Sequence, residues 1–202
     1  MGNKYESLAF TDSVKSVQQE MGSRSAHTLR EAGRESNSLL GPKEAMFIAG
    51  RDGFYIASCS ETGWPYVQFR GGPPGFLRLL DKGTLGYADF KGNRKYITTG
   101  NVLANNRVAL FLMDYPHRRR LKIFGHMKMV AGANRELVAR LSVENYPGGI
   151  EQAVLIKVAA FDWNCPQHIT PRYTKAEHDA MMALERDQFF PSRLGNPKSV
   201  EV

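Results

Sequence analysis

Short β-rich segments fill the middle of the chain, and turns that contain Gly or Pro separate them. Apolar and β-branched residues at 54–58, 66–70, 76–80 and 84–89 predict four strands. The first two form a hairpin through the Ser60–Gly63 turn, and the last two surround Asp81–Gly83. Residues 108–113, 121–130 and 153–161 predict three more strands, with Gly125 as a bulge or kink inside its strand.

Helical patterns lie around these strands. Thr11 can cap a helix that carries Val14, Val17 and Met21 on one face and ends at Gly22. Pro42 suits the first turn of another helix. Residues 93–106 and 133–141 predict two more helices, and Thr174-x-x-Glu177 is a capping box that begins a C-terminal one.

Strands and helices do not alternate regularly, which disfavours a doubly wound parallel sheet. The pattern predicts a mainly β protein, a six- to seven-stranded antiparallel barrel, closed or partly closed, with peripheral helices. We expect a helical N-terminal arm at residues 1–40 and a barrel domain at 41–170. A C-terminal helix and tail at 171–202 are expected to pack on the same domain.

Composition sets further limits on this picture. The chain has 202 residues, of which 42% are hydrophobic and 23% charged, as in ordinary globular domains. No apolar run of about 18 residues occurs, and the N-terminus lacks a signal-peptide pattern, so we expect a cytoplasmic protein with Cys59 and Cys165 as free thiols. No Cys/His cluster has zinc-ligand spacing, and the patterns G-x-S-x-G, P-loop and G-x-G-x-x-G are missing.

The net charge of +7 favours anionic partners: nucleic acid, acidic lipid or phosphorylated small molecules. One basic segment is Asn93-Arg94-Lys95, where a strand runs through a Gly-containing turn into a predicted helix. Cations in a first helical turn cost up to ~1 kcal/mol unless an anion lies among them. Backbone N–H groups, a guanidinium and an ammonium would together form a phosphate site. A solvated basic turn explains this segment equally well.

A second basic cluster is His117-Arg118-Arg119-Arg120 with Lys122. Arg120 and Lys122 share one strand face, which could bind an anion, while Leu121 and Ile123 fill the barrel. The alternative is a solvated hairpin loop. A nucleic-acid site would need basic residues interleaved with exposed aromatics over a wide face, and this short cluster does not supply them.

The segment Phe-Asp-Trp-Asn-Cys-Pro-Gln-His at 161–168 follows the last strand. Trp163 could stack on an aromatic ring. The Gln167 amide could hydrogen-bond to a ligand edge that has both donors and acceptors, and His168 could hydrogen-bond or shuttle a proton. In the simpler interpretation, Trp163 closes the end of the barrel and His168 is a surface histidine.

From Pro42 to His168 the chain resembles the pyridoxamine 5′-phosphate oxidase superfamily of FMN-binding split barrels, most specifically at 89–95 and 163–168. The resemblance implies that Asn93, Arg94 and Lys95 take the place of a Ser-Arg-Lys that grips the FMN phosphate. It implies further flavin or ribityl contacts from Gln68, Phe69, Arg70, Gly71, Asp89 and Arg120, with Gln68 in place of an arginine and Arg120 in place of a glutamine. Trp163 corresponds to a tryptophan that reaches the flavin from the partner subunit, and Gln167 and His168 would close the ring end.

The resemblance also implies a homodimer with FMN between the barrels. We therefore predict an FMN-dependent oxidoreductase acting on a small molecule, with His168 as the candidate catalytic residue. The oxidase's Arg-Leu-x-Pro pattern is missing, and its substrate lysine is lost among Gly72-Pro73-Pro74, which disfavours pyridoxamine phosphate as substrate. The alternatives are a non-catalytic carrier or sensor of flavin, deazaflavin or haem, and a basic nucleic-acid-binding barrel.

Overall fold

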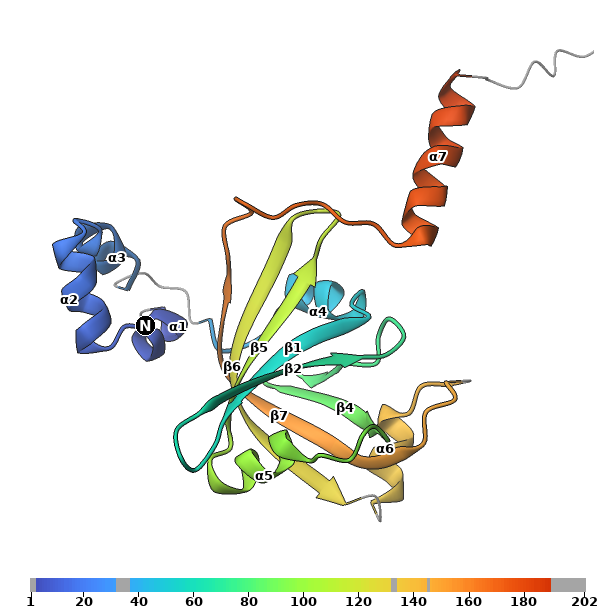
Figure 1. Cartoon of the computed structure of the whole chain (residues 1–202). Coiled ribbons are helices and arrows are strands. Elements are labelled where there is room, and N and C mark those ends of the chain that lie inside the picture. The colour runs from blue at the N-terminus through green and yellow to red at the C-terminus, as the bar shows by residue number, and fades with distance from the viewer. Residues whose placement is uncertain (1–2, 32–36, 132–133, 145, 190–202) are drawn as a thin grey trace, which may run out of the picture.

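Seven strands form one antiparallel sheet that curls into a split barrel (Figure 1). The computed structural model describes residues 3–31, 37–131, 134–144 and 146–189. The strand order is β2-β1-β5-β6-β7-β4-β3, and every neighbouring pair is antiparallel. The predicted fold class is confirmed. The strands are β1 (Gly53–Cys59), β2 (Pro65–Gly71), β3 (Arg78–Asp81), β4 (Thr84–Phe90), β5 (Arg107–Asp114), β6 (Arg119–Ala131) and β7 (Ile150–Trp163).

Seven helices lie around the barrel in the part of the chain that is described. In Figure 1, α1, α2 and α3 gather on one side, α6 lies beside β4 and β7, and α7 extends away from the sheet. The predicted caps are confirmed: Thr11 Oγ1 accepts from Val14 N at 3.4 Å, and Thr174 and Glu177 form the capping box. The helices are α1 (Lys4–Ala9), α2 (Asp12–Glu20), α3 (Arg24–Glu31), α4 (Pro42–Ala49), α5 (Ile97–Ala104), α6 (Arg135–Leu141) and α7 (Lys175–Phe189).

The barrel closes through aromatic side chains that come from distant places in the sheet order. Phe54 on β1 meets Tyr87 on β4 with ring centroids 5.5 Å apart, and Phe76 stacks on Phe54 at 5.8 Å. All three rings are buried, and burying such rings is a large hydrophobic contribution. Phe76 and Leu77 were predicted to begin a strand, but they enter the core as part of a loop, and β3 begins only at Arg78.

The long strands β6 and β7 meet at a bulge opposite Gly125, the residue predicted as a bulge or kink, and the extra residue is Ala159 on β7. Their register shifts between Phe124 and Gly125. A Cβ on Gly125 would lie 2.6 Å from Ile156 Cγ2 and 2.9 Å from the carbonyl oxygen of Lys157, so only glycine fits. The bulge increases the local twist, which lets the two strands wrap around the core.

The N-terminal arm is joined to the outer face of the sheet through α1. Tyr5 stacks on Phe124 with centroids 4.6 Å apart, and Lys122 Nζ lies 4.8 Å from the centre of the Tyr5 ring. Lys122 also pairs with Asp162 at 3.0 Å, so the strand face predicted as a possible anion site is occupied at this position. The apolar face predicted for α2 exists, but none of the α2 residues is buried in the single chain.

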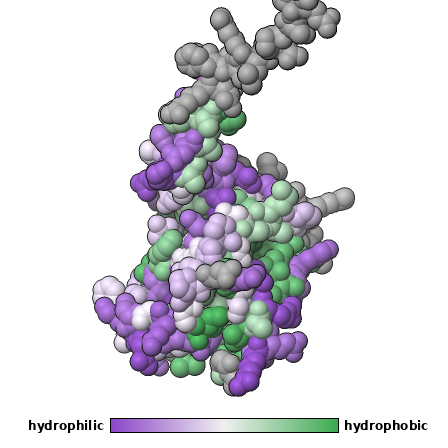
Figure 2. Space-filling view, turned by 90° about the vertical axis from the view of Figure 1, so that its right-hand side faces the viewer, coloured by the Kyte–Doolittle hydropathy of each residue, from purple (hydrophilic) through white to green (hydrophobic). Residues whose placement is uncertain are grey.

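The C-terminal helix α7 has mostly exposed side chains over residues 175–185. Figure 2 shows it standing above the barrel, with hydrophilic and hydrophobic side chains both on its surface. Its packing on the same domain stays a prediction, and the expected loose tail from Pro191 lies outside the described residues.

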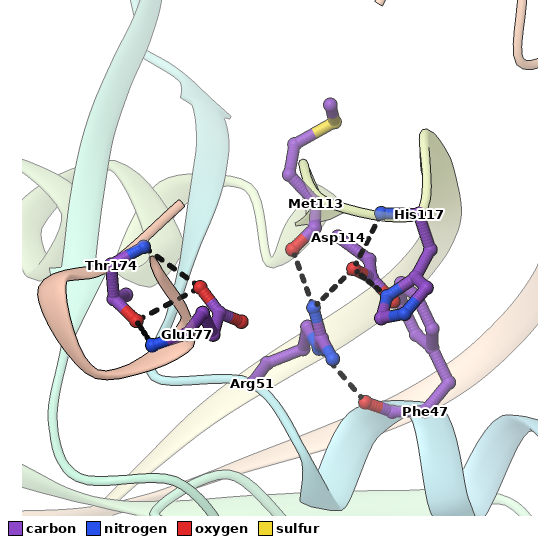
Figure 3. A network of polar contacts seen from close by, with 7 residues as sticks. All are labelled: Phe47, Arg51, Met113, Asp114, His117, Thr174 and Glu177. Atoms are coloured by element: carbon purple, nitrogen blue, oxygen red, sulfur yellow. Dashed lines mark hydrogen bonds and ion pairs between the residues drawn. The ribbon is translucent and has the colours of Figure 1, made fainter. Parts of the chain in front are cut away.

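A polar network fixes the end of α4 to the β5–β6 turn (Figure 3). Arg51 Nη1 lies 3.4 Å from Asp114 Oδ1 and donates to the Met113 carbonyl at 3.2 Å, while Arg51 Nε donates to the Phe47 carbonyl at 3.2 Å. The ring and backbone nitrogens of His117 meet the same Asp114 oxygen at 2.8 and 3.3 Å. Although burial acts to raise the pKa of Asp114, the His117 hydrogen bonds and the Arg51 charge hold it below its usual value.

This network predicts that the stability of the folded chain falls at acidic pH. Because the pKa of Asp114 is lower in the folded chain than the ~3.9 of an unfolded Asp, its stabilising contribution is complete above that value and is lost as the pH falls through the folded pKa. Asp114→Asn should lower the free energy of unfolding at pH 7 by about 2 kcal/mol, and the deficit should shrink below about pH 4. Urea denaturation across this range measures it, with the exposed Asp179→Asn as control. A deficit that stays constant with pH would contradict the assignment.

Candidate functional site

A polar pocket of about 260 Å³ lies where β2 and β4 approach each other without pairing. β2 is one edge of the sheet, and β4 lies next to the other edge, so the curl of the barrel brings them together. The loop from β4 to α5 forms the rim of the pocket, and Glu151 at the start of β7 completes it. The lining residues are Tyr66, Gln68, Phe69, Arg70, Asp89, Phe90, Gly92, Asn93, Arg94, Lys95, Tyr96, Ile97, Thr98, Thr99 and Glu151.

An ion pair across the seam between β2 and β4 forms one wall of this pocket. Arg70 Nη1 lies 2.8 Å from Asp89 Oδ1, and the two side chains are only 23% and 7% exposed. The contact is close in distance but lacks the alignment of a good hydrogen bond. The second Asp89 oxygen accepts from Gln152 Nε2 at 3.1 Å, so β7 holds this carboxylate in place.

The Gln68 amide links the ion pair to α5. In the orientation that satisfies both of its polar atoms, its nitrogen donates to Thr98 Oγ1 at 3.1 Å and its oxygen accepts from Arg70 Nη2 at 2.8 Å. Below them, burial raises the pKa of the Tyr87 hydroxyl well above its usual range, and Arg70 only partly opposes this shift. Tyr87 is therefore neutral, and Arg70 and Asp89 are the charges on this side of the pocket.

The rim loop departs from the predicted helix. α5 begins at Ile97, not at Asn93, so Arg94 and Lys95 precede the helix instead of lying in its first turn. Asn93 Oδ1 accepts from Lys95 N at 3.2 Å, as in an Asx turn, and Arg94 and Tyr96 have φ values of +59° and +49°. A left-handed residue cannot continue a right-handed helix, which explains the later start.

A carboxylate contacts the rim cation. Tyr96 OH accepts from Arg94 Nε at 3.0 Å and donates to Glu151 Oε1 at 3.1 Å, and Arg94 Nε lies 3.8 Å from the same oxygen. The Tyr96 hydroxyl and the Glu151 charge raise the pKa of Arg94 above its usual value. The pocket thus carries three cations, Arg70, Arg94 and Lys95, against two carboxylates, Asp89 and Glu151.

Seven of the twelve predicted site residues line this pocket, and Gly71 follows at the end of β2 without lining it. The remaining four lie at the other end of the barrel. Trp163 Nε1 donates to Glu44 Oε1 at 2.7 Å, and the guanidinium of Arg119 lies 5.1 Å from the Trp163 ring centre. The simpler prediction, that Trp163 packs at the end of its own barrel, describes these contacts. The pocket residues are Gln68, Phe69, Arg70, Asp89, Asn93, Arg94 and Lys95; the distant ones are Arg120, Trp163, Gln167 and His168.

The distant residues cannot reach the pocket of their own chain. Glu151 lines the pocket near the start of β7, and Trp163 ends the same strand twelve residues later, roughly 40 Å along it at about 3.3 Å per residue. Arg120 lies beside Trp163, since the Arg120 carbonyl accepts from Asn164 N at 3.2 Å. Gln167 and His168 follow in an exposed loop, where His168 has a φ of +62°.

Several pocket residues escaped the prediction from sequence. Tyr66 and Thr98 are ordinary strand and helix residues, and Tyr96 was expected inside a helix. Glu151 was expected in a loop, because the last strand was predicted to begin at Ala153. Only the β4–β7 pairing, which places Asp89 opposite Gln152, brings Glu151 to the pocket.

Fold and pocket together define a split-barrel protein with a polar pocket lined by cations at its seam. The sequence profile described as Pyridoxamine 5′-phosphate oxidase matches residues 40–163, more than half of the chain. The chain therefore belongs to the pyridoxamine 5′-phosphate oxidase family. No curated protein matches the sequence.

Solved structures share the fold at low sequence identity. HupZ from Group A Streptococcus is 15% identical with a TM-score of 0.50, and the match covers 66% of this chain and 100% of that one. An FMN-binding protein from Syntrophomonas wolfei subsp. wolfei is 11% identical with a TM-score of 0.44, covering 75% and 97%. An FAD-binding protein from Mesorhizobium loti is 14% identical with a TM-score of 0.42, covering 61% and 94%. At 15% identity the likeness to HupZ establishes the fold alone.

The described part of the chain contains no group of three or more His, Cys, Asp or Glu side chains that could hold a metal ion. None of its helices is long and apolar enough to cross a membrane. Cys59 and Cys165 are free thiols.

The seam ion pair predicts coupled stability effects. Arg70→Met leaves the buried Asp89 carboxylate without its cation and should cost about 2–3 kcal/mol, less than a fully buried pair would because Arg70 is partly exposed. Asp89→Asn should also destabilise the chain, and the double variant should lose clearly less than the sum of the two. Chemical denaturation measures all three. Additive losses would mean that the ion pair does not bridge the seam.

Proposed function

We propose that this chain binds FMN in the seam pocket and acts as an FMN-dependent oxidoreductase on a small-molecule substrate. The observation that carries this proposal is the gathering of Arg70, Arg94 and Lys95 around one polar pocket, in a member of the pyridoxamine 5′-phosphate oxidase family. When bound, FMN would supply hydride or electron transfer, while the protein supplies binding, orientation and electrostatics.

The charges and volume of the pocket fit the phosphate end of FMN. Three cations against two carboxylates leave a net positive site, and charge-assisted hydrogen bonds from Arg and Lys suit a phosphate. Pockets that hold a whole drug-sized ligand have about 300–1,000 Å³. A pocket of about 260 Å³ therefore suits the phosphate and ribityl chain, and the flavin ring needs further walls.

In this proposal Asn93, Arg94 and Lys95 hold the phosphate from the rim. Arg70 adds a cation that Asp89 and Gln68 orient, since both contact its guanidinium. Gln68 and Asp89 present polar atoms to the ribityl chain. Phe69 and Gly71 lie where the chain leaves the pocket along β2.

We also propose that the remaining walls come from a second copy of the chain. Arg120, Trp163, Gln167 and His168 lie far from their own pocket, so a ligand can meet both groups only across a subunit interface. The outer face of β1 and β2 is suited to such an interface. Val67 and Phe69 are 60% and 59% exposed there beside Tyr55, and Phe69 also lines the pocket. Apolar side chains that gather on a surface mark interaction sites.

One observation favours a non-catalytic flavin carrier as the second candidate. No histidine or cysteine lines the seam pocket among the described residues, so the pocket itself lacks the imidazole that most often serves as a general acid or base. Catalysis would depend on His168 from the second copy. In the carrier alternative, bound flavin would not be reduced by pyridine nucleotides or small oxidisable substrates.

Flavin retention tests the phosphate site. The purified protein, mixed with FMN and desalted, should keep two visible flavin bands. Arg94→Ala should weaken FMN binding about tenfold or more, because a charge-assisted hydrogen bond contributes about 1.5–3 kcal/mol. Arg135→Ala removes an exposed cation on α6 and should leave binding unchanged. A wild-type protein that keeps no flavin would contradict the proposal and direct the search to haem, deazaflavin and nucleic acid.

His168 can be tested separately from binding. His168→Asn removes the imidazole and keeps a residue that tolerates the positive φ of this position. It should retain FMN like the wild type but slow anaerobic flavin reduction by NADH or NADPH about a hundredfold, as loss of an acid–base group does. Unchanged reduction would remove His168 from the mechanism. A wild-type flavin that neither nucleotide reduces would favour the carrier.

A further inference from the structure

The two carboxylates of the seam pocket lie in different environments. Asp89 is 7% exposed, is 2.8 Å from Arg70 and is held from behind by Gln152. Glu151 is 24% exposed, and its partner Arg94 is 63% exposed at 3.8 Å, a long contact open to water. Exposed pairs of this kind contribute little and are easily exchanged. Asp89 is therefore a fixed part of the pocket, and Glu151 is a removable partner.

From this contrast we infer that Glu151 is a built-in competitor for the phosphate of the ligand, and that it weakens the hold of the pocket on phosphorylated ligands. The inference rests on the proposed phosphate-binding function of Arg94. Glu151 supplies the anion that Arg94 contacts in the structure. A phosphate that binds Arg94 must displace this carboxylate and remain close to it.

The Tyr96 hydroxyl makes this exchange possible without unfolding the loop. It accepts from Arg94 and donates to Glu151, so it joins the cation and the carboxylate in one exposed chain of contacts. A hydroxyl can rotate to new partners, and the guanidinium carries several donors besides Nε. Arg94 can therefore turn to a phosphate while Tyr96 keeps its bond to Glu151. The negative charge of Glu151 then opposes the phosphate by repulsion.

The test compares FMN with riboflavin, which has the same ring and ribityl chain but no phosphate. Glu151→Gln removes the charge and keeps the shape of the side chain. It should bind FMN about three- to tenfold more tightly than the wild type, with riboflavin affinity unchanged. Glu151→Ser, which removes the same charge with a different shape, should shift FMN affinity in the same direction. Glu185→Gln on α7 removes an exposed carboxylate at the far end of the molecule and should change neither affinity (Figure 1).

Two results would overturn the inference. Weaker FMN binding by Glu151→Gln would mean that Glu151 positions Arg94 for the phosphate. Equal changes for FMN and riboflavin would mean that Glu151 acts on the ribityl chain, on the ring or on the fold.

Failure of the flavin proposal is distinguishable from failure of this one. If the wild type binds neither flavin, inorganic phosphate becomes the probe, and the readout is the rise in Tm that it causes. A larger rise for Glu151→Gln than for the wild type would uphold the competition at Arg94 without flavin. An equal or smaller rise would overturn it.

Discussion

The seam between β2 and β4 is the constraint on which the rest of this structure depends. The curl of the sheet brings these strands together, but no backbone hydrogen bonds join them, and an open edge must be managed by side chains. Below the seam, Phe54, Phe76 and Tyr87 close it by burial. At its surface, the Arg70–Asp89 ion pair bridges the two strands. A gap that polar side chains bridge is accessible to ligands, and this is why the cation-lined pocket lies here and not over a paired part of the sheet.

The length of β7 imposes a second constraint. One strand carries Glu151 at the pocket and Trp163 at the opposite end of the barrel, so a single chain cannot bring its two groups of predicted site residues to one small molecule. If the proposed function is right, the site must be shared between two copies, and the exposed side chains Val67 and Phe69 beside the pocket mark the surface where they meet. Complete binding of the cofactor would then require the dimer.

Local signals in the sequence were sufficient to predict the existence of the seven strands, the caps at Thr11 and Thr174, and an irregularity at Gly125, because each depends on alternation or on a few neighbouring residues. They did not fix where β3 and β7 begin. The cluster Asn93–Lys95 was predicted as a phosphate site for a partly wrong reason. Its cations do not lie in a helical turn, because Arg94 and Tyr96 adopt left-handed backbone angles that no composition rule forecasts for these residues. Glu151 could not be predicted, since its place in the pocket follows from the β4–β7 register. What α2 and α7 pack against could not be predicted either, because both helices expose apolar residues in the single chain.

The separation of the two residue groups also separates binding from chemistry. The seam pocket offers fixed charge: a guanidinium that Asp89 orients, two rim cations, and the Glu151 carboxylate beside one of them. None of these side chains is an imidazole, so the pocket can hold an anion but lacks the group that most often carries out proton transfer in enzymes. In the proposed enzyme the candidate for proton transfer is His168, which lies exposed in the loop after β7 in a left-handed conformation. In the proposed enzyme, the loop at 164–169, more than the barrel, would decide the chemistry.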